Sequence, residues 1–198
     1  MRIGVLALQG DFREHRHAVE ALGHVSLEVR LPADLDLVDA LVIPGGESTT
    51  IAKLAVMYGI VEPLQKHIRS GLPVLGTCAG MIFLASGLVD GAQPQLGVLD
   101  AIVERNAFGR QNESFEADLD IAGFDDPLRA VFIRAPRITD VGPEVEVLAE
   151  VDGRPVAVRQ GNILAIAFHP ELTDDRRFHE MLIDMAGADR EPLAEGQI

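Results

Sequence analysis

The sequence has one cysteine, one tyrosine and no tryptophan among its 198 residues. A single cysteine cannot form a disulfide within the chain. The scarcity of Trp and Tyr argues against an aromatic platform on which nucleic-acid bases could stack. No apolar run approaches the roughly 20 residues that a membrane-spanning helix needs. We therefore expect no internal disulfide, no nucleic-acid platform and no membrane span.

Basic residues are also scarce. Lys and Arg number 17 against 31 for Asp and Glu, which gives a formal net charge of −14. Such a charge opposes binding to nucleic acid and to anionic membrane surfaces. The first five residues enter a strand-like run and do not have the shape of a signal peptide. Together with the unpaired cysteine, this favours the cytoplasm, where thiols stay reduced.

The sequence does contain enough apolar residues for one sizeable core. Hydrophobic residues make up 47% and charged residues 24%, a balance typical of globular proteins. The length fits a single domain rather than two. We expect one domain over residues 1–186 and a polar, frayed tail over residues 187–198.

Strand and helix patterns alternate in the first half of the chain. Apolar runs of strand length lie at residues 3–8, 40–43 and 72–75, and helical patterns follow them. In the second half, strand patterns at 145–151, 155–159 and 163–168 are separated by dipeptides that favour hairpin turns. This order predicts an α/β three-layer sandwich with a central mixed, mainly parallel sheet.

Three helix starts carry capping residues in the sequence. Asp11 followed by Glu14 fits an N-cap with a capping box. Ser48 or Thr49 is expected to cap the helix after the Gly45-Gly46 loop. Thr173 is expected to cap a final helix that extends to about residue 185.

The single cysteine occupies the centre of the small-residue segment Gly76-Thr77-Cys78-Ala79-Gly80. An apolar strand pattern precedes this segment and a helical pattern follows it. Such a turn between strand and helix is where a nucleophile can be exposed at the end of a sheet. A thiol beside a helix N-terminus and an imidazole also loses its proton more readily. The alternative is a buried cysteine that only packs, and the five residues alone leave both interpretations open.

A base and an orienting group follow the last strand pattern. His169 and Glu171 are two residues apart, so in an extended chain they face the same side. An imidazole can take a thiol proton near neutral pH, and a carboxylate can orient it. The alternative is a surface turn with an incidental histidine. Combined with Cys78, the pattern favours a Cys-His-Glu triad.

Backbone donors for an oxyanion can also be predicted. Gly46 follows a buried strand pattern, and glycine allows the backbone to approach a ligand closely. Its N–H and that of Ala79 would form a two-donor oxyanion hole. A plain glycine turn is the alternative, and no phosphate-loop pattern is present. The remaining histidines form no cluster of metal-ligand type, so we predict no metal site.

These motifs together resemble those of the triad (class I) glutamine amidotransferases. Six blocks are further similar to the glutaminase subunits of pyridoxal 5'-phosphate synthases, and they lie at residues 4–10, 44–49, 76–81, 105–111, 132–136 and 168–173. The Cys78 block and the His169 block belong to the whole superfamily. The blocks at 105–111 and 132–136 distinguish this branch.

The resemblance implies a flavodoxin-like class I glutamine amidotransferase fold and hydrolysis of glutamine to glutamate and ammonia. In that reaction Cys78 attacks the side-chain amide, His169 shuttles protons and Glu171 orients His169. The implied substrate contacts are Gly46, Glu47, Ser48, Arg105, Ile133 and Arg134. Glu47 and Arg105 have the charges that an amino acid zwitterion requires, although each could instead form a surface ion pair.

The resemblance also implies a protein partner and no cofactor. Gln9 and Gly10 correspond to the region that contacts the synthase partner, which is a TIM-barrel enzyme in a large hetero-oligomer. Ammonia would pass to that partner without entering bulk solvent, and docking would complete the oxyanion hole.

Three alternatives stay open on the sequence alone. A glutaminase subunit of another amidotransferase would keep the triad but should lack the 105–111 block. A triad hydrolase or peptidase on a similar fold would not need Glu47 and Arg105 to bind an amino acid. A regulatory subunit that has lost catalysis is opposed by the intact triad residues.

Overall fold

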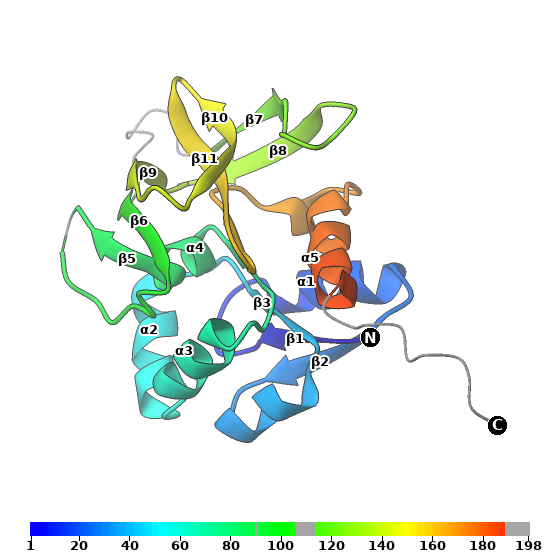
Figure 1. Cartoon of the computed structure of the whole chain (residues 1–198), viewed down its shortest axis with the longest axis vertical. Helices are drawn as coiled ribbons and strands as arrows, with labels where there is room; N and C mark the ends of the chain where they lie inside the picture. Colours follow the sequence, from blue (N-terminus) through cyan, green and yellow to red (C-terminus); the bar gives the residue numbers. More distant parts are fainter. Residues whose placement is uncertain (90, 106–113, 189–198) are drawn as a thin grey trace.

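A seven-stranded sheet forms the centre of the molecule (Figure 1). The structure is a computed structural model that describes residues 1–89, 91–105 and 114–188. The strand order is β10-β11-β12-β4-β3-β1-β2. The strands are β1 (Arg2–Leu6), β2 (Val25–Val29), β3 (Ala40–Ile43), β4 (Val74–Thr77), β10 (Glu146–Val151), β11 (Arg154–Gln160) and β12 (Ile163–Ile166).

The sheet is mixed and mainly parallel, as the sequence predicts. Strands β2, β1, β3, β4 and β12 pair in parallel, and β11 and β10 extend the sheet with antiparallel pairs. Every residue of β3, β4 and β12 is buried, because layers cover both faces of a parallel sheet. Asp152 and Gly153 join β10 to β11 with φ angles of 51° and 68°, as a hairpin turn of the I′ type requires.

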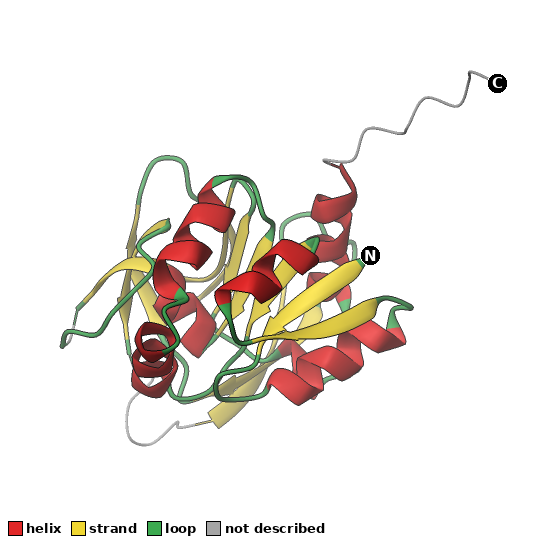
Figure 2. Cartoon of the chain, turned by 90° about the horizontal axis from the view of Figure 1, so that it is seen from below, coloured by secondary structure: helices red, strands yellow, loops and turns green. Residues whose placement is uncertain are grey.

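Helices cover both faces of this sheet and complete three layers (Figure 2). On one face lie α1 (Phe12–Ala21) and α5 (Arg177–Ala188), and α5 contacts β3 and β4. The other face carries α2 (Ser48–Met57), α3 (Val61–Arg69) and α4 (Ala79–Leu84). Helix α4 contacts β3, β4 and β12, and α2 packs against α4.

Within the described residues, two small sheets and two 3-10 helices were not anticipated from the sequence. The three-stranded sheet joins β5 (Ala85–Leu88), β6 (Leu99–Glu104) and β9 (Arg137–Val141). The two-stranded sheet joins β7 (Ser114–Leu119) and β8 (Leu128–Ile133). The 3-10 helices are η1 (Pro32–Leu37) and η2 (Pro170–Leu172).

The predicted helix caps need correction at α1 and α2. Asp11 occupies the N-cap position of α1, but its side chain makes no capping hydrogen bond. Helix α2 is capped by Glu47, whose carboxylate accepts hydrogen bonds from the backbone N–H groups of Thr49 and Thr50. A glutamate side chain is long enough to reach those donors from the N-cap position, so the hydroxyl of Ser48 is not needed there.

The end of the chain also differs from the prediction. Thr173 ends η2, and α5 begins at Arg177, whose backbone N–H donates to the side chain of Asp175. Helix α5 continues through Gly187 and Ala188, which were predicted to belong to the tail. The rest of that predicted tail, residues 189–198, lies outside the described residues. Among the helices of the described ranges, none is long and apolar enough to cross a membrane.

Candidate active site

Four loops that follow neighbouring strands meet at one edge of the central sheet. Gln9 follows β1, Gly46 follows β3, Cys78 follows β4 and His169 follows β12. The carboxyl ends of parallel strands lie at the same edge, which is where open α/β sheets bind ligands. A cavity of about 450 Å³ opens there, lined by Gln9, Asp11, Gly46, Glu47, Ser48, Cys78, Ala79, Ile82, Arg105, Ile133, Arg134 and His169.

This cavity brings together ten of the residues singled out in the sequence. Glu171 does not line it and lies behind His169, while Gly10 packs against the backbone of Gly45. Asp11 and Ile82 were not predicted as site residues. The cavity has the size of a small-molecule site.

Cys78 lies on a strained turn between β4 and α4. Its φ of 46° and ψ of −102° are rare for a residue with a side chain, and such strain is concentrated at functional sites. Its backbone N–H donates to the carbonyl of Ile166 at 2.8 Å, which ties the turn to β12. A Cβ atom on Gly80 would collide with the backbone oxygen of Ile43, so this turn can pack on β3 only with glycine there.

His169 is held between Cys78 and Glu171. Its Nδ1 lies 2.7 Å from Glu171 Oε1, and the Glu171 side chain has no exposed surface. Burial by itself lowers the pKa of His169, but hydrogen bonds and charge interactions with Cys78 and Glu171 outweigh it and raise the pKa to about 10. Burial raises the pKa of Glu171, and its interaction with His169 opposes that shift. The three side chains form the order that a nucleophile, a proton carrier and an orienting carboxylate require.

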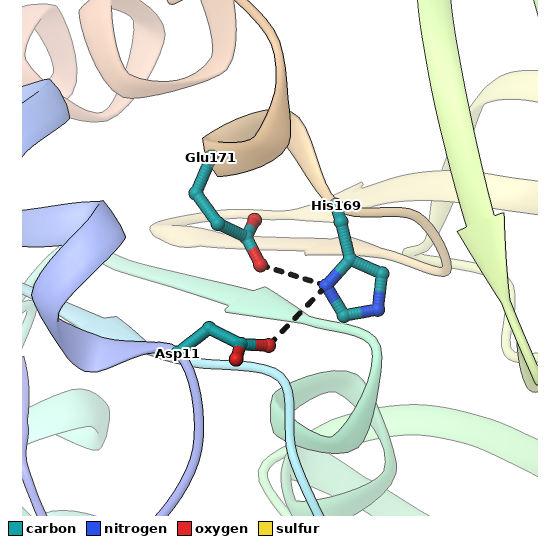
Figure 3. Close-up of side chains that lie close together, drawn as sticks. All are labelled: Asp11, His169 and Glu171. Atoms are coloured by element: carbon teal, nitrogen blue, oxygen red, sulfur yellow. Dashed lines mark hydrogen bonds and ion pairs between the residues drawn. The ribbon is translucent and has the colours of Figure 1, made fainter.

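Asp11 is a second carboxylate beside His169. Its Oδ2 lies 3.7 Å from the same Nδ1 that bonds to Glu171, and both carboxylates point toward that nitrogen (Figure 3). Unlike Glu171, the Asp11 side chain is 43% exposed. The side chain that was predicted to cap α1 therefore faces the imidazole instead.

Asp11, His169 and Glu171 also have the composition of a metal site. Their ligand atoms lie within 4.8 Å of one another. Two ligands of a tetrahedral zinc ion would lie about 3.4 Å apart at bond lengths of about 2.0–2.1 Å. The separation of 2.7 Å between His169 Nδ1 and Glu171 Oε1 is instead that of a direct hydrogen bond. We therefore interpret the cluster as carboxylates that orient an imidazole.

The loop after β3 lies beside Cys78 and is fixed by Gln9. Gly46 has a φ of +147°, and the N–H of the next residue, Glu47, donates to Gln9 Oε1 at 2.7 Å. A Cβ on Gly46 would lie 2.6 Å from that oxygen, so a larger residue would displace Gln9. Gly46 and Ala79 both line the cavity. The role of their backbone N–H groups as donors to an oxyanion stays a prediction.

Two residues of the cavity wall, Ser48 and Arg105, share one hydrogen-bond partner, Gln93. Gln93 Oε1 accepts hydrogen bonds from Ser48 Oγ at 3.2 Å and from Arg105 Nη1 at 3.3 Å. Gln93 was not predicted, because it lies in a loop without a recognisable pattern. Arg134 has a φ of 44° and is a second strained residue at this cavity.

Glu47 has a structural role as well as a place in the cavity wall. Its carboxylate accepts hydrogen bonds from the hydroxyl and backbone N–H groups of Thr49 and Thr50 at the start of α2. The hydrogen bond from the Thr49 hydroxyl contributes most among these bonds, and together they lower the pKa of Glu47 to about 2, against the opposing effect of burial.

Most of the 105–111 block that distinguishes this branch, residues 106–111, lies outside the described residues.

Residues 5–187 of the chain match the SNO glutamine amidotransferase family. The chain belongs to this family. The match spans the turn at Cys78, the Gly45-Gly46 loop and the segment with His169.

Relatives within the family are similar over nearly their whole length. The pyridoxal 5'-phosphate synthase subunit PdxT of Streptomyces avermitilis is 59% identical, with 96% of each chain covered. The subunits of the same name from Mycobacteroides abscessus and Fervidobacterium nodosum are 56% and 53% identical, with 94% and 93% of this chain and 97% of each relative covered. These matches confirm the branch that the sequence blocks indicate.

Solved structures confirm the fold class. A crystal structure of a glutamine amidotransferase superposes with a TM-score of 0.90 at 54% identity, covering 93% of this chain and 98% of that one. A glutamine amidotransferase from Thermotoga maritima superposes with a TM-score of 0.61 at 15% identity, covering 96% of this chain and 85% of that one. That second likeness concerns the fold alone.

Proposed function

We propose that the protein is the glutaminase subunit of a pyridoxal 5'-phosphate synthase and hydrolyses L-glutamine to L-glutamate and ammonia. The observation that carries the proposal is the Cys78–His169–Glu171 arrangement at a cavity of small-molecule size. The 59% identical PdxT relative supports the assignment to pyridoxal phosphate synthesis over another amidotransferase. Membership of a glutamine amidotransferase family opposes a peptidase role.

In the proposed reaction, Cys78 Sγ attacks the carbonyl carbon of the glutamine side chain. The proton released from the thiol is carried by His169, whose raised pKa suits it to hold that proton at neutral pH. The carbon–nitrogen bond then breaks, and the nitrogen takes the proton from the imidazolium and leaves as ammonia. A water that gives a proton to His169 attacks the thioester, the carbon–sulfur bond breaks, and Cys78 recovers its proton. Glu171 keeps Nδ1 protonated so that Nε2 can exchange protons.

Charge on the carbonyl oxygen develops during both attacks. The N–H groups of Gly46 and Ala79 are the proposed donors, since both residues line the cavity beside Cys78. Removing one such donor typically costs about 3–4 kcal/mol of transition-state stabilisation. Arg105, Ile133 and Arg134 are proposed to contact the amino acid part of glutamine. Arg105 is the proposed partner of the glutamine α-carboxylate.

Two of the residues predicted to bind the substrate, Glu47 and Ser48, also have a structural role. Glu47 would bind the ammonium group while it also caps α2. The Ser48 hydroxyl donates to Gln93 and would keep the start of α2 against the substrate.

We further propose that ammonia is used by a partner synthase of TIM-barrel type within a hetero-oligomer. Gln9 and Gly10 are the proposed contact region, because they follow β1 at the same edge of the sheet as the cavity. The Gln9 side chain accepts a hydrogen bond from the N–H of Glu47, next to Gly46. Docking of the partner at Gln9 would therefore act directly on the loop that contains the proposed oxyanion donor Gly46. A cytoplasmic location would keep the single thiol reduced.

The test is glutamate release from glutamine, measured with and without the synthase partner. Wild-type protein is expected to be a weak glutaminase alone and to gain activity with the partner, whereas Cys78→Ala is expected to release no glutamate in either case. Release that survives the substitution would remove the nucleophile assignment. Full activity of the isolated wild-type chain would remove the partner requirement.

A further inference from the structure

Two buried histidines lie directly behind the triad. His15 is on α1 and His179 is on α5, and neither has any exposed surface. His15 Nδ1 lies 2.9 Å from His179 Nε2, within hydrogen-bond distance. The proposed reaction assigns neither of them a role, yet burying two imidazoles in a core is costly unless their polar atoms are paired.

The second oxygen of the Glu171 carboxylate points toward this pair. Among the described residues, no hydrogen bond reaches Glu171 Oε2, which is fully buried. His15 Nε2 forms a hydrogen bond with Thr77 Oγ1 at 3.2 Å and lies 3.3 Å from Glu171 Oε2 without a hydrogen bond to it. A buried carboxylate oxygen without a donor is costly, and bulk water does not hydrate a side chain with no exposed surface.

Both imidazoles are neutral at neutral pH. Burial, followed by the charges of His179 and His169, lowers the pKa of His15 well below its ordinary value. Burial, followed by the charge of Arg176, lowers the pKa of His179 to about 4. A neutral imidazole has one N–H donor and one acceptor nitrogen, so two of the four tautomer combinations of the pair keep the hydrogen bond between His15 Nδ1 and His179 Nε2.

One of these two arrangements fits the surroundings better than the other. If both rings are protonated at Nε2, His179 donates to His15 Nδ1, and His15 Nε2–H faces Glu171 Oε2 and Thr77 Oγ1. If both are protonated at Nδ1, the His15 Nε2 lone pair faces the carboxylate. His179 Nδ1–H would then be a buried donor for which the described residues offer no acceptor. The first arrangement leaves only an acceptor nitrogen unpaired, which is the smaller penalty.

We propose that His15 is a positioning residue for Glu171: its Nε2, hydrogen-bonded to Thr77 Oγ1, lies 3.3 Å from Oε2 and fixes that oxygen by a polar contact, so that Oε1 stays on His169 Nδ1. His179 fixes the tautomer of His15 in this arrangement. The inference rests on the proposed glutaminase function and adds to it a second layer of support behind the orienting carboxylate. His15 does not line the cavity, so it acts through the residues that it contacts, and Glu171 is the one of these that bonds to His169.

This role explains how one of two nearby carboxylates becomes the orienting group. Asp11 Oδ2 is 3.7 Å from His169 Nδ1, but Asp11 is partly exposed and contacts with solvent compete for it. Glu171 lies at 2.7 Å and is fully buried, and its far oxygen is 3.3 Å from the buried His15 Nε2. Asp11 and His15 lie one turn apart on α1, where the His15 N–H is bonded to the Asp11 carbonyl.

The test uses three substitutions at position 15, with glutamine as substrate and the synthase partner present. His15→Gln places an amide N–H near the position of Nε2, His15→Asn is too short to reach it, and His15→Leu removes all polar atoms. We expect kcat to fall roughly 10- to 100-fold for the asparagine and leucine variants and to stay within about threefold for the glutamine variant. The KM for glutamine should not change in any of them.

A double-mutant cycle separates positioning from general structural support. If His15 acts through Glu171, His15→Leu should lower kcat by less than about twofold when Glu171 is already Gln. An equal loss in both backgrounds, or equal losses for His15→Gln and His15→Asn, would overturn the proposal. If the leucine variant does not fold, the Gln and Asn pair still decides the question, with melting temperatures as the check of folding.

Failure of this inference can be told apart from failure of the proposed function. If Cys78→Ala is inactive but all folded His15 variants keep the wild-type kcat, only the role of His15 is wrong. If Cys78→Ala still releases glutamate, the proposed function itself is wrong.

Discussion

Replacing Glu171 by glutamine tests how much the orienting carboxylate contributes to the reaction. Glu171→Gln keeps the size and shape of the side chain but removes the charge that faces His169 Nδ1 at 2.7 Å. The amide can also present its NH₂ group to that nitrogen, which would favour the wrong tautomer of the imidazole. Both effects weaken the ability of His169 to carry the thiol proton and deliver it to the leaving nitrogen.

The size of the loss can be worked from the electrostatics of His169. Its pKa rises from 6.5 to about 10, which corresponds to about 5 kcal/mol in favour of the imidazolium. If Glu171 supplies about half of that, its removal costs about 2–3 kcal/mol, or on the order of 10²-fold in rate. Loss of tautomer control adds to this, and the corresponding exchange in a serine protease triad costs about 10⁴-fold. We therefore expect kcat to fall between about 10²- and 10⁴-fold.

The assay is steady-state glutamate release with the synthase partner present, together with thermal unfolding of each variant. Asp11→Asn is the matched control, because it removes a carboxylate at 3.7 Å that is partly exposed and therefore screened. We expect the control to lose less than about tenfold in kcat. A folded Glu171→Gln variant with kcat within fivefold of wild type, or a larger loss for Asp11→Asn, would refute the orienting role of Glu171.

Two further substitutions test the supports of the site. Gly80→Ala puts a Cβ against the backbone oxygen of Ile43, so the free energy of unfolding, measured by urea titration, should fall by about 1–3 kcal/mol. An unchanged free energy of unfolding would show that the turn at Cys78 can move to accept the methyl group. For Glu47, whose pKa is lowered to about 2 from 4.5, the stabilising effect of the charge is present above about pH 4.5 and lost as pH falls toward 2. The stability difference between wild type and Glu47→Gln should close over that range, and a difference independent of pH would contradict the capping role.

The central sheet was predictable because its strands are continuous apolar runs separated by clear turns. Residues 163–166 and 40–43 are buried on both faces, and the Asp152-Gly153 turn has a conformation that few other residue pairs adopt easily. The two small sheets were not predictable in this way. Strand β7 alternates exposed and half-buried residues over most of its length, a pattern too weak to distinguish an edge strand from a loop.

The grouping of Cys78, His169 and Glu171 could be anticipated because each of the motifs involved is local in the sequence, while the catalytic roles stay a proposal. The turn around Cys78 and the spacing of His169 and Glu171 have a chemical meaning within five residues. The roles of Asp11 and His15 depend on contacts between residues far apart in the chain, so no local pattern reveals them. One signal was present, since His15 lies on the same face of α1 as the buried residues Ala18 and Val19.

The predicted capping hydrogen bonds of α1 and α2 were wrong for a related reason, although Asp11 does occupy the N-cap position of α1. Asp11 and Glu47 are both near helix starts, where an acidic side chain can either cap the helix or turn into the site. The sequence pattern is the same in both cases. Which option is taken depends on His169 for Asp11 and on the Thr49 and Thr50 donors for Glu47, and only the folded structure brings these groups together.

The most direct test of the account is the intact mass of the protein after reaction with a chloroketone analogue of glutamine, with the synthase partner present. Cys78 is the only thiol in the chain, so a single covalent adduct can be assigned without ambiguity. We predict one adduct that forms on Cys78, is slowed by excess glutamine and is absent in Cys78→Ala. An adduct that forms equally in Cys78→Ala, or one that glutamine does not slow, would contradict the claim that Cys78 is the nucleophile of a glutamine site.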